Sequence, residues 1–253
     1  MIRIYRKLFF SKLIIALDDE YFDELIKKRL YKSYSSVVAL TYRDLTLPDF
    51  GRMVKTTALI DLTQTPSAVF ARFNDTTRNE IRRTENNERL RFKAEDQNFH
   101  GLYDLYKKFE FSQGRVPIRF IEFQNYPIFA AYLDDELISA VSIFSGGKHL
   151  RIRSIFSKRL AVDDKEMYKI ISNASRRVIW EVCTWGKERG FSFLDMASVN
   201  LDNPNTASIA RFKMNFNGTL VTEYTYMYKS GIFKLFERLV VIPHFFKKLG
   251  VRF

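Results

Sequence analysis

The sequence predicts a layered α/β (α+β) fold in which helices flank a mixed, mostly antiparallel sheet. Residues 128–157 hold three apolar runs separated by an acidic turn at 134–136 and a glycine-containing turn at 145–147. That pattern is typical of three consecutive antiparallel strands. The stretch 164–190 then repeats apolar residues at helical spacing, and 191–197 reads as another strand. Together they predict a strand–helix–strand unit.

The remaining elements follow from helix caps and periodicity. Thr65 is a typical helix cap and Pro66 a typical first helical residue, so a helix is expected to begin there. The stretch 99–109 repeats aromatic residues at helical spacing, which favours a core-facing helix. The other predicted elements are a helix at 19–32, strands at 36–42, 54–62 and 90–94, helical turns as far as about 87, a short helix around 213 and a strand after 218.

The chain of 253 residues, 46% of them hydrophobic, is long enough to bury a sizeable core. A polar stretch at 95–98 suggests one boundary, and a second is placed beyond 228. We therefore predict an α/β half at 1–95, a second domain at 96–228 and a basic amphipathic tail at 229–253. We expect the tail to dock on the first half, with contact to an anionic membrane as the alternative.

The net charge of +12 predicts anionic partners. Phosphorylated cofactors, nucleotide-linked substrates, RNA and an acidic membrane face all fit this charge. No apolar run approaches the ~20 residues that span a bilayer. The first 17 residues lack the cleavage site of a signal peptide. We expect a cytoplasmic protein, with peripheral attachment at the inner face of the membrane as a further option.

Several common kinds of site are excluded by the motifs that the sequence lacks. A single cysteine and three widely spaced histidines argue against a disulfide framework, a zinc site and a histidine-based triad. We therefore expect no metal. The glycines form neither G-x-G-x-x-G nor G-x-x-x-x-G-K, and there is no G-x-S-x-G. These absences exclude Rossmann and Walker nucleotide sites. They also exclude a serine hydrolase whose nucleophile lies in a G-x-S-x-G turn.

Two charged residues point to a site near the end of the 191–197 strand. Asp195 lies towards the carboxyl end of this apolar strand, and Lys213 lies on the short helix that re-enters the sheet. Both side chains can therefore face one crevice at the strand ends, which is where α/β sheets usually bind their ligands. An ordinary capping carboxylate and a solvated lysine are the alternatives.

Three segments resemble motifs of one known family. The sequence RNEIRR at 78–83 is similar to R-x-x-I-R-R/K, and the long helix ending in WGKERG at 185–190, followed by Asp195, is similar to A-x-x-x-G-x-x-x-Y-D. FKMNFNG at 212–218 is similar to F-K-x-x-F-G, with Asn217 where the family usually has its first glycine. In this order, they resemble the FemAB-like branch of the GNAT acyltransferase superfamily, which includes peptidoglycan bridge-forming aminoacyltransferases.

The resemblance implies a GNAT-like fold with a reduced N-terminal half. It implies an N-acyltransferase whose donor is an acyl-CoA such as acetyl-CoA, or an aminoacyl-tRNA. The acceptor would be an amine of a cell-envelope precursor, a saccharide or a small molecule. Lys213 and Asp195 would be catalytic, with Lys213 stabilising developing negative charge and Asp195 orienting the amine. The residues expected to bind substrate are Phe212, Phe216, Arg78 and Arg82.

The anionic part of the donor is expected near the end of the third meander strand. Arg151 and Arg153 share one face of that strand, and backbone amides from Ser154 to Ser157 could stabilise an oxyanion at a bulge. Lys158, Arg159 and the amino end of the next helix could hold phosphate. Exposed or ion-paired arginines are the alternative. The usual GNAT loop for acetyl-CoA, Q/R-x-x-G-x-G/A, is missing here.

A second function class stays open. A non-catalytic RNA-binding or envelope-associated module would also use the net charge of +12 and the 15% aromatic content. Lysine and arginine would contact phosphates while aromatic rings stack on bases. tRNA and an anionic membrane surface are therefore partners to consider under both hypotheses.

Overall fold

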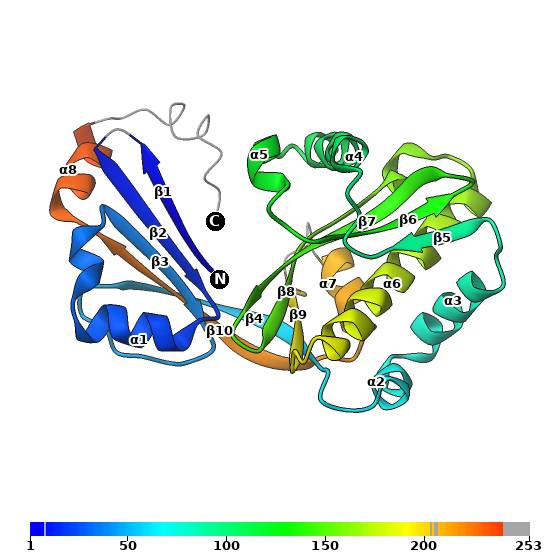
Figure 1. Cartoon of the computed structure of the whole chain (residues 1–253), viewed down its shortest axis with the longest axis horizontal. Helices are drawn as coiled ribbons and strands as arrows, with labels where there is room; N and C mark the ends of the chain where they lie inside the picture. Colours follow the sequence, from blue (N-terminus) through cyan, green and yellow to red (C-terminus); the bar gives the residue numbers. More distant parts are fainter. Residues whose placement is uncertain (8, 203, 205–206, 240–253) are drawn as a thin grey trace.

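The ten strands form one mixed sheet with helices on both of its faces (Figure 1). The computed structural model describes residues 1–7, 9–202, 204 and 207–239. The strand order is β1-β2-β3-β10-β4-β9-β8-β7-β6-β5. Only the β2–β3 and β8–β9 pairs are parallel, so the predicted layered, mostly antiparallel fold is confirmed.

The strand bounds show how closely periodicity located the elements. The strands are β1 (Ile2–Lys7), β2 (Phe10–Ala16), β3 (Ser36–Thr41), β4 (Gly51–Asp61), β5 (Leu90–Lys93), β6 (Ile128–Leu133), β7 (Glu136–Gly146), β8 (His149–Ser157), β9 (Phe193–Ser198) and β10 (Thr219–Lys229). The three meander strands β6, β7 and β8 lie where they were predicted. β1 and β2 form a hairpin that the sequence analysis did not assign.

The helices depart from prediction at two breaks. The helices are α1 (Asp19–Lys27), η1 (Leu30–Ser33), α2 (Pro66–Arg72), α3 (Asp75–Glu85), α4 (Phe99–Ser112), α5 (Phe120–Phe123), η2 (Lys158–Ala161), α6 (Lys165–Glu188), α7 (Ala207–Met214) and α8 (Gly231–Leu239). The helix predicted at 19–32 ends early because Arg29 adopts a left-handed conformation, with φ 53°. Asn74 caps α3 by accepting a hydrogen bond from the Thr77 amide, which separates α3 from α2.

The sheet combines strands from both predicted domains. β10, near the end of the described chain, lies between β3 and β4, and β4 also pairs with β9. β5 pairs with β6. The division at residue 95 stays a prediction, since both predicted parts contribute strands to one sheet. The predicted tail is described as far as residue 239, where α8 packs on β2, and residues 240–253 lie outside the described residues.

Helices cover the two faces unequally. The main core lies between α6 and the central strands, where Val178 and Ile179 of α6 pack with Leu194 and Met196 of β9. α3 packs on α6 on this same side. α4 and α5 cover the opposite face over β6, β7 and β8, and α1 packs on the N-terminal strands. Within the described residues, no helix is long and apolar enough to cross a membrane.

A glycine lies where the end of β7 meets the chain that follows β2. A Cβ atom at Gly146, the last residue of β7, would lie 2.1 Å from the carbonyl oxygen of Ala16 and 2.9 Å from that of Leu17. We therefore expect Gly146→Ala to lower the free energy of unfolding by about 1–3 kcal/mol, because backbone atoms must shift. Urea unfolding measures this loss. Gly51→Ala is the control, since its nearest atom is 3.7 Å away, and an equal loss in both variants would contradict the prediction.

Candidate active site

A buried ion-pair network connects strands β8, β9 and β10 of the sheet. The Arg151 guanidinium on β8 pairs with the Asp195 carboxylate on β9, and its Nη1 lies 2.5 Å from Oε2 of Glu223 on β10. The exposed fractions of Arg151, Asp195 and Glu223 are 8%, 0% and 2%. Burial alone would lower the pKa of Arg151, but the two carboxylates outweigh it and raise the pKa. The guanidinium charge is thus neutralised inside the protein.

Asp195 has a full set of hydrogen-bond donors. Its Oδ2 accepts from the Tyr42 hydroxyl at 2.7 Å and from Arg151, while its Oδ1 accepts from the Thr57 hydroxyl and from the Ala197 amide at 2.7 Å. Ala197 has φ 60° at a bulge where β9 departs from its register with β4. We call these five side chains the polar cluster: Tyr42, Thr57, Arg151, Asp195 and Glu223.

The polar cluster faces away from α6. Leu194 and Met196 belong to the core under α6, and side chains alternate along a strand, so Asp195 points to the other face. His149 lies on that face too, with its ring stacked on Phe193 at 5.2 Å between centroids. Burial lowers the pKa of His149. The imidazole is therefore an aromatic neighbour of the cluster.

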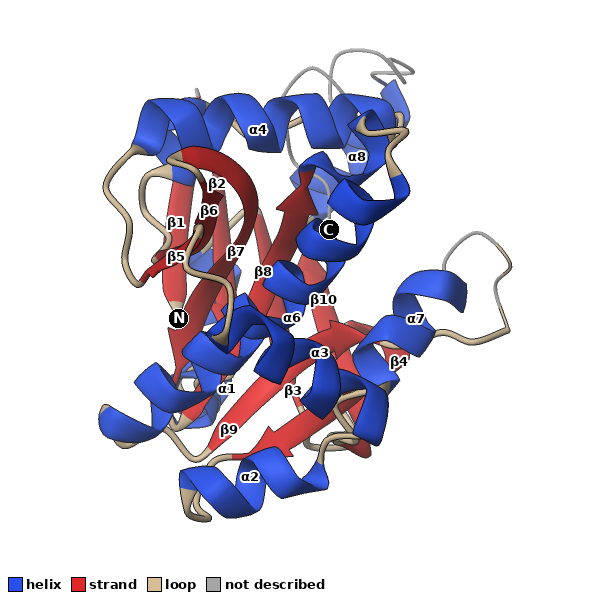
Figure 2. Ribbon diagram, turned by 90° about the vertical axis from the view of Figure 1, so that its right-hand side faces the viewer, coloured by secondary structure: helices blue, strands red, loops and turns tan. Residues whose placement is uncertain are grey.

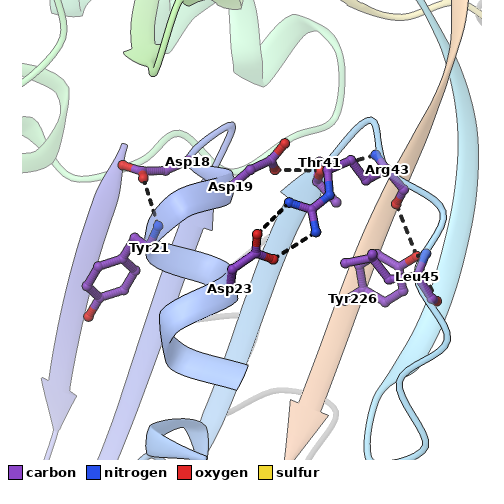
Figure 3. Close-up of polar contacts among 8 residues, drawn as sticks. All are labelled: Asp18, Asp19, Tyr21, Asp23, Thr41, Arg43, Leu45 and Tyr226. Carbon is purple, nitrogen blue, oxygen red and sulfur yellow. Dashed lines mark hydrogen bonds and ion pairs between the residues drawn. The ribbon is translucent and has the colours of Figure 1, made fainter. Parts of the chain in front are cut away.

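The loop after β3 brings Tyr42 to the cluster, and Figure 3 shows what holds this loop. The Tyr226 hydroxyl accepts a hydrogen bond from the Leu45 amide at 2.5 Å. Arg43 donates to both carboxylate oxygens of Asp23, at 2.8 and 2.7 Å. The loop is thereby fixed to α1 and β10, so the first 50 residues contribute a positioned side chain to the cluster. Burial, followed by the charge of Asp195, raises the pKa of Tyr42.

Lys213 of α7 lies beside the polar cluster. Its ammonium donates to the carbonyl oxygen of Ser198, the last residue of β9, at 2.9 Å. Only 9% of the residue is exposed. Burial, with a smaller contribution from the Arg151 charge, lowers the pKa of Lys213 to about 8. The structure thus brings Lys213 and Asp195 to the same strand end, as the sequence predicted. Near pH 8, half of the Lys213 side chains would be neutral amines.

The parallel strands β8 and β9 separate at the polar cluster (Figure 2). They pair at three positions that end with Arg151 opposite Asp195. β8 continues to Ser157, and no described strand pairs with residues 152–157 on the β9 side. A bulge against β7 falls at Arg153, between Ile152 and Ser154. An extended chain with amide groups could add to this free strand edge.

The residues predicted to bind the donor lie along this divergence but are engaged within the protein. Arg153 stacks on the Tyr126 ring at 4.7 Å, and the Ser154 and Ser142 hydroxyls lie 2.6 Å apart. The Ser157 hydroxyl accepts from the Arg159 amide at 3.4 Å. Lys158 pairs with Glu136, and Arg159 stacks on Tyr168 at 5.3 Å.

The amino end of α6 is already capped by an acid. The two carboxylate oxygens of Asp164 accept from the amides of Glu166 and Met167, at 3.2 and 3.1 Å. These are donors that the sequence analysis assigned to phosphate. A carboxylate in this position satisfies the helix end and repels a second anion.

The residues predicted to bind substrate lie on the α6 side, where Phe216 belongs to the core and the other three lie nearer the surface. Phe216 is 1% exposed and packs on Phe73, with 5.1 Å between ring centroids. Phe212 is half-buried beneath the Arg176 guanidinium. Arg78 of α3 donates to two carbonyl groups and pairs with Asp75, and Arg82 stacks on Phe70 at 5.5 Å. None of the four contacts the polar cluster in the described hydrogen bonds and ion pairs.

Sequence reasoning missed the contributions of Glu223, Tyr42 and Thr57. Glu223 is the only acid in the strand 219–229, among β-branched and aromatic residues, and an isolated acid in such a strand is a usable signal. Tyr42 and Thr57 carried no such signal. Among the described residues, no group of His, Cys, Asp and Glu could hold a metal ion.

Comparisons with known proteins identify the fold. FemX aligns with 94% of this chain and 85% of its own, at a TM-score of 0.63 and 8% identity. The chain has a FemAB-like fold. L-PGS from Bacillus licheniformis aligns at TM-score 0.55 and 16% identity, covering 99% of this chain and 86% of its own. The C-terminal domain of a protein described as a lysylphosphatidylglycerol synthetase, from Agrobacterium fabrum, aligns at 0.58 and 13%, covering 99% and 87%.

The alignments cover between 85% and 87% of these three neighbours' chains. The polar cluster and the β8–β9 divergence therefore lie within a fold that is shared over most of their length. No protein-family model matches the sequence, and no curated protein matches it.

Proposed function

We propose that the protein is an acyltransferase that moves an aminoacyl group from aminoacyl-tRNA to an amine of a cell-envelope precursor, saccharide or small molecule. The observation that carries this proposal is the divergence of β8 and β9 beside the Lys213 ammonium. The fold shared with FemX supports the reaction class. The name of the Agrobacterium fabrum neighbour, which denotes an aminoacylated lipid, supports an aminoacyl group.

The reaction needs a bound carbonyl, a neutral amine and stabilisation of an oxyanion. In the proposal, the donor's acyl end lies at the free edge of β8 at 152–157, where its ester carbonyl accepts a backbone hydrogen bond and its α-amino group donates one. The acceptor nitrogen attacks the ester carbon, an N–C bond forms and the C–O bond to the ribose breaks. The nitrogen loses a proton and the ribose oxygen gains one. The Lys213 ammonium stabilises negative charge on the carbonyl oxygen.

The polar cluster has a positioning role in this proposal. The four donors around Asp195 leave it no free acceptor for a substrate amine, and Arg151 is matched by two carboxylates. Both side chains therefore hold β8, β9 and β10 in the arrangement that presents Lys213. We therefore propose that Asp195 positions the strands, and not that it contacts the acceptor amine as the sequence resemblance implied.

The amino end of α6 favours tRNA over CoA as donor. The pyrophosphate of CoA would need free amides at a helix amino end, and here Asp164 already occupies two of them. Lys158 and Arg159, in the η2 turn before α6, are paired with Glu136 and stacked on Tyr168. Acyl-CoA remains the second candidate because the free β8 edge would also accept an extended amide-bearing arm.

The test presents both donors to the purified chain. Bulk tRNA charged with labelled amino acids, or labelled acetyl-CoA, is incubated with the protein and an extract of envelope lipids and precursors. We expect label to move from tRNA to an acceptor, and to remain on tRNA with Lys213→Met. Transfer from acetyl-CoA instead would select the second donor. Salt-sensitive binding of charged and uncharged tRNA alike, without transfer, would favour a non-catalytic RNA-binding module.

A further inference from the structure

Apolar side chains protrude from one end of the sheet. Phe9, in the turn between β1 and β2, is 94% exposed. Ile232 and Leu235 of the neighbouring helix α8 are 78% and 57% exposed, and Phe236 is 41% exposed. Large apolar residues exposed singly are ordinary, but several on adjoining segments mark an interaction surface. We call these four residues the apolar tip.

The packing of α8 makes the apolar tip one structural unit. Phe233 and Phe236 contact the Phe10 ring, at 5.3 and 4.9 Å between centroids. The Ser230 hydroxyl accepts from the Phe233 amide at 3.2 Å, which fixes the start of the helix. One side of α8 is therefore anchored beside Phe9, while Ile232 and Leu235, three residues apart, lie on a single exposed side.

A second group of exposed apolar residues lies on the same side of the molecule. Phe111 of α4 is 60% exposed, Val116 in the α4–α5 connection is 49% exposed, and Ile121 of α5 is 67% exposed. α4, α8 and the β1–β2 turn all lie at the top of Figure 1, and α4 and α8 are again at the top in Figure 2. The two views share the vertical axis, so these segments lie at the same end of the molecule. A broad, nearly planar partner could contact both groups at once.

The charges on these segments favour an anionic partner. The three acids of α4, α5 and their connection are each ion-paired: Asp104 with Lys107 at 3.3 Å, Glu110 with Arg115 at 2.8 Å and Glu122 with Arg3 at 4.0 Å. The first 12 residues contain no acid and four basic residues, and α8 contains one acid, Glu237, and two basic residues. Exposed basic residues on these segments include Arg6, Lys108, Arg119 and Lys234.

We propose that this side of the protein docks on an anionic lipid bilayer. The apolar tip enters the interface between headgroups and acyl chains, and the basic residues contact lipid phosphates. Protruding apolar residues in two separate groups, with exposed basic residues on the same segments, fit a deformable planar surface of negative charge. The inference concerns binding alone, and it therefore stands or falls independently of acyl transfer.

The test is co-sedimentation of the full chain with vesicles. Vesicles of phosphatidylglycerol and phosphatidylcholine are compared with vesicles of phosphatidylcholine alone. We expect the unmodified chain to sediment with the first kind and to be released by salt. Phe9→Asp and Leu235→Asp should each weaken partitioning about tenfold or more, because each removes one apolar side chain from the interface and adds a charge.

Leu201→Asp is the matched control. Leu201 is 50% exposed, close to Leu235, but it lies in the connection between β9 and α7, away from α8. Circular dichroism of all variants establishes that they are folded. Unchanged partitioning of the Phe9 and Leu235 variants, equal loss in the Leu201 variant, or no sedimentation of the unmodified chain would each overturn the proposal. Binding to RNA in place of vesicles would do so too.

Discussion

Arg151→Met should destabilise the fold by about 3–5 kcal/mol, the loss typical of removing one partner from a buried ion pair. The reason is that Asp195 and Glu223, 0% and 2% exposed, would both lose the guanidinium between them. Asp195 would keep the hydroxyls of Tyr42 and Thr57, but Glu223 Oε2 has no other described hydrogen-bond donor. Urea unfolding at neutral pH, followed by circular dichroism, measures the difference.

Two further variants separate the ion pairs from the loss of side-chain packing. Arg153→Met removes a guanidinium from the same strand, but Arg153 stacks on Tyr126 and forms no ion pair within the described residues, so we expect a loss of about 1 kcal/mol. Arg151→Met combined with Glu223→Gln should recover part of the stability, because one unpaired charge is removed. Equal losses for Arg151→Met and Arg153→Met would mean that the network does not stabilise the sheet.

The local part of the fold could be predicted because its signals lie close together in sequence. β6, β7 and β8 follow one another through tight turns, and α6 carries its apolar residues at regular helical spacing. The insertion of β10 between β3 and β4 could not be read in this way, since it joins segments about 180 residues apart. The β1–β2 hairpin was missed because its alternation is weak at an exposed edge, where Ile2 and Ile4 are 40% and 48% exposed.

In the candidate site, too, only the residues that lie close together in sequence could be placed in advance. Asp195 and Lys213 lie in neighbouring segments, and their position at one strand end was expected from the order of elements. The role of Arg151 could not be predicted, because its guanidinium pairs with Glu223. That carboxylate lies on β10, a strand that the order of elements in the sequence does not place near β8. Phe216 shows the reverse case. It belongs to a recognisable motif, but its packing on Phe73 makes it part of the core.

Lys213→Met should lower transfer at least about 100-fold, the effect of removing a donor from an oxyanion site. The same variant should be no less stable than the unmodified protein at pH 7. Burial lowers the pKa of Lys213 from 10.5 to about 8, so the folded state disfavours the ammonium. Below pH 8 both folded and unfolded states are protonated and this penalty is complete. Between pH 8 and 10.5 the unfolded state binds more protons, and the advantage of the methionine variant should therefore disappear as pH rises.

The pH dependence of transfer decides which form of Lys213 acts. If the ammonium stabilises the oxyanion, kcat/KM should fall as pH rises through about 8, because the charged form is lost there. Lys187→Met is the matched control. Lys187 donates to the Thr63 carbonyl at 2.9 Å, the same contact that Lys213 makes with Ser198, but it belongs to α6 and does not adjoin the polar cluster. Full transfer activity in Lys213→Met would contradict an electrostatic role for the ammonium. A rise in rate through pH 8 that disappears in Lys213→Met would contradict it too, and would indicate that the neutral Lys213 amine takes the proton from the attacking nitrogen. A rise shared by both proteins reports deprotonation of the acceptor amine.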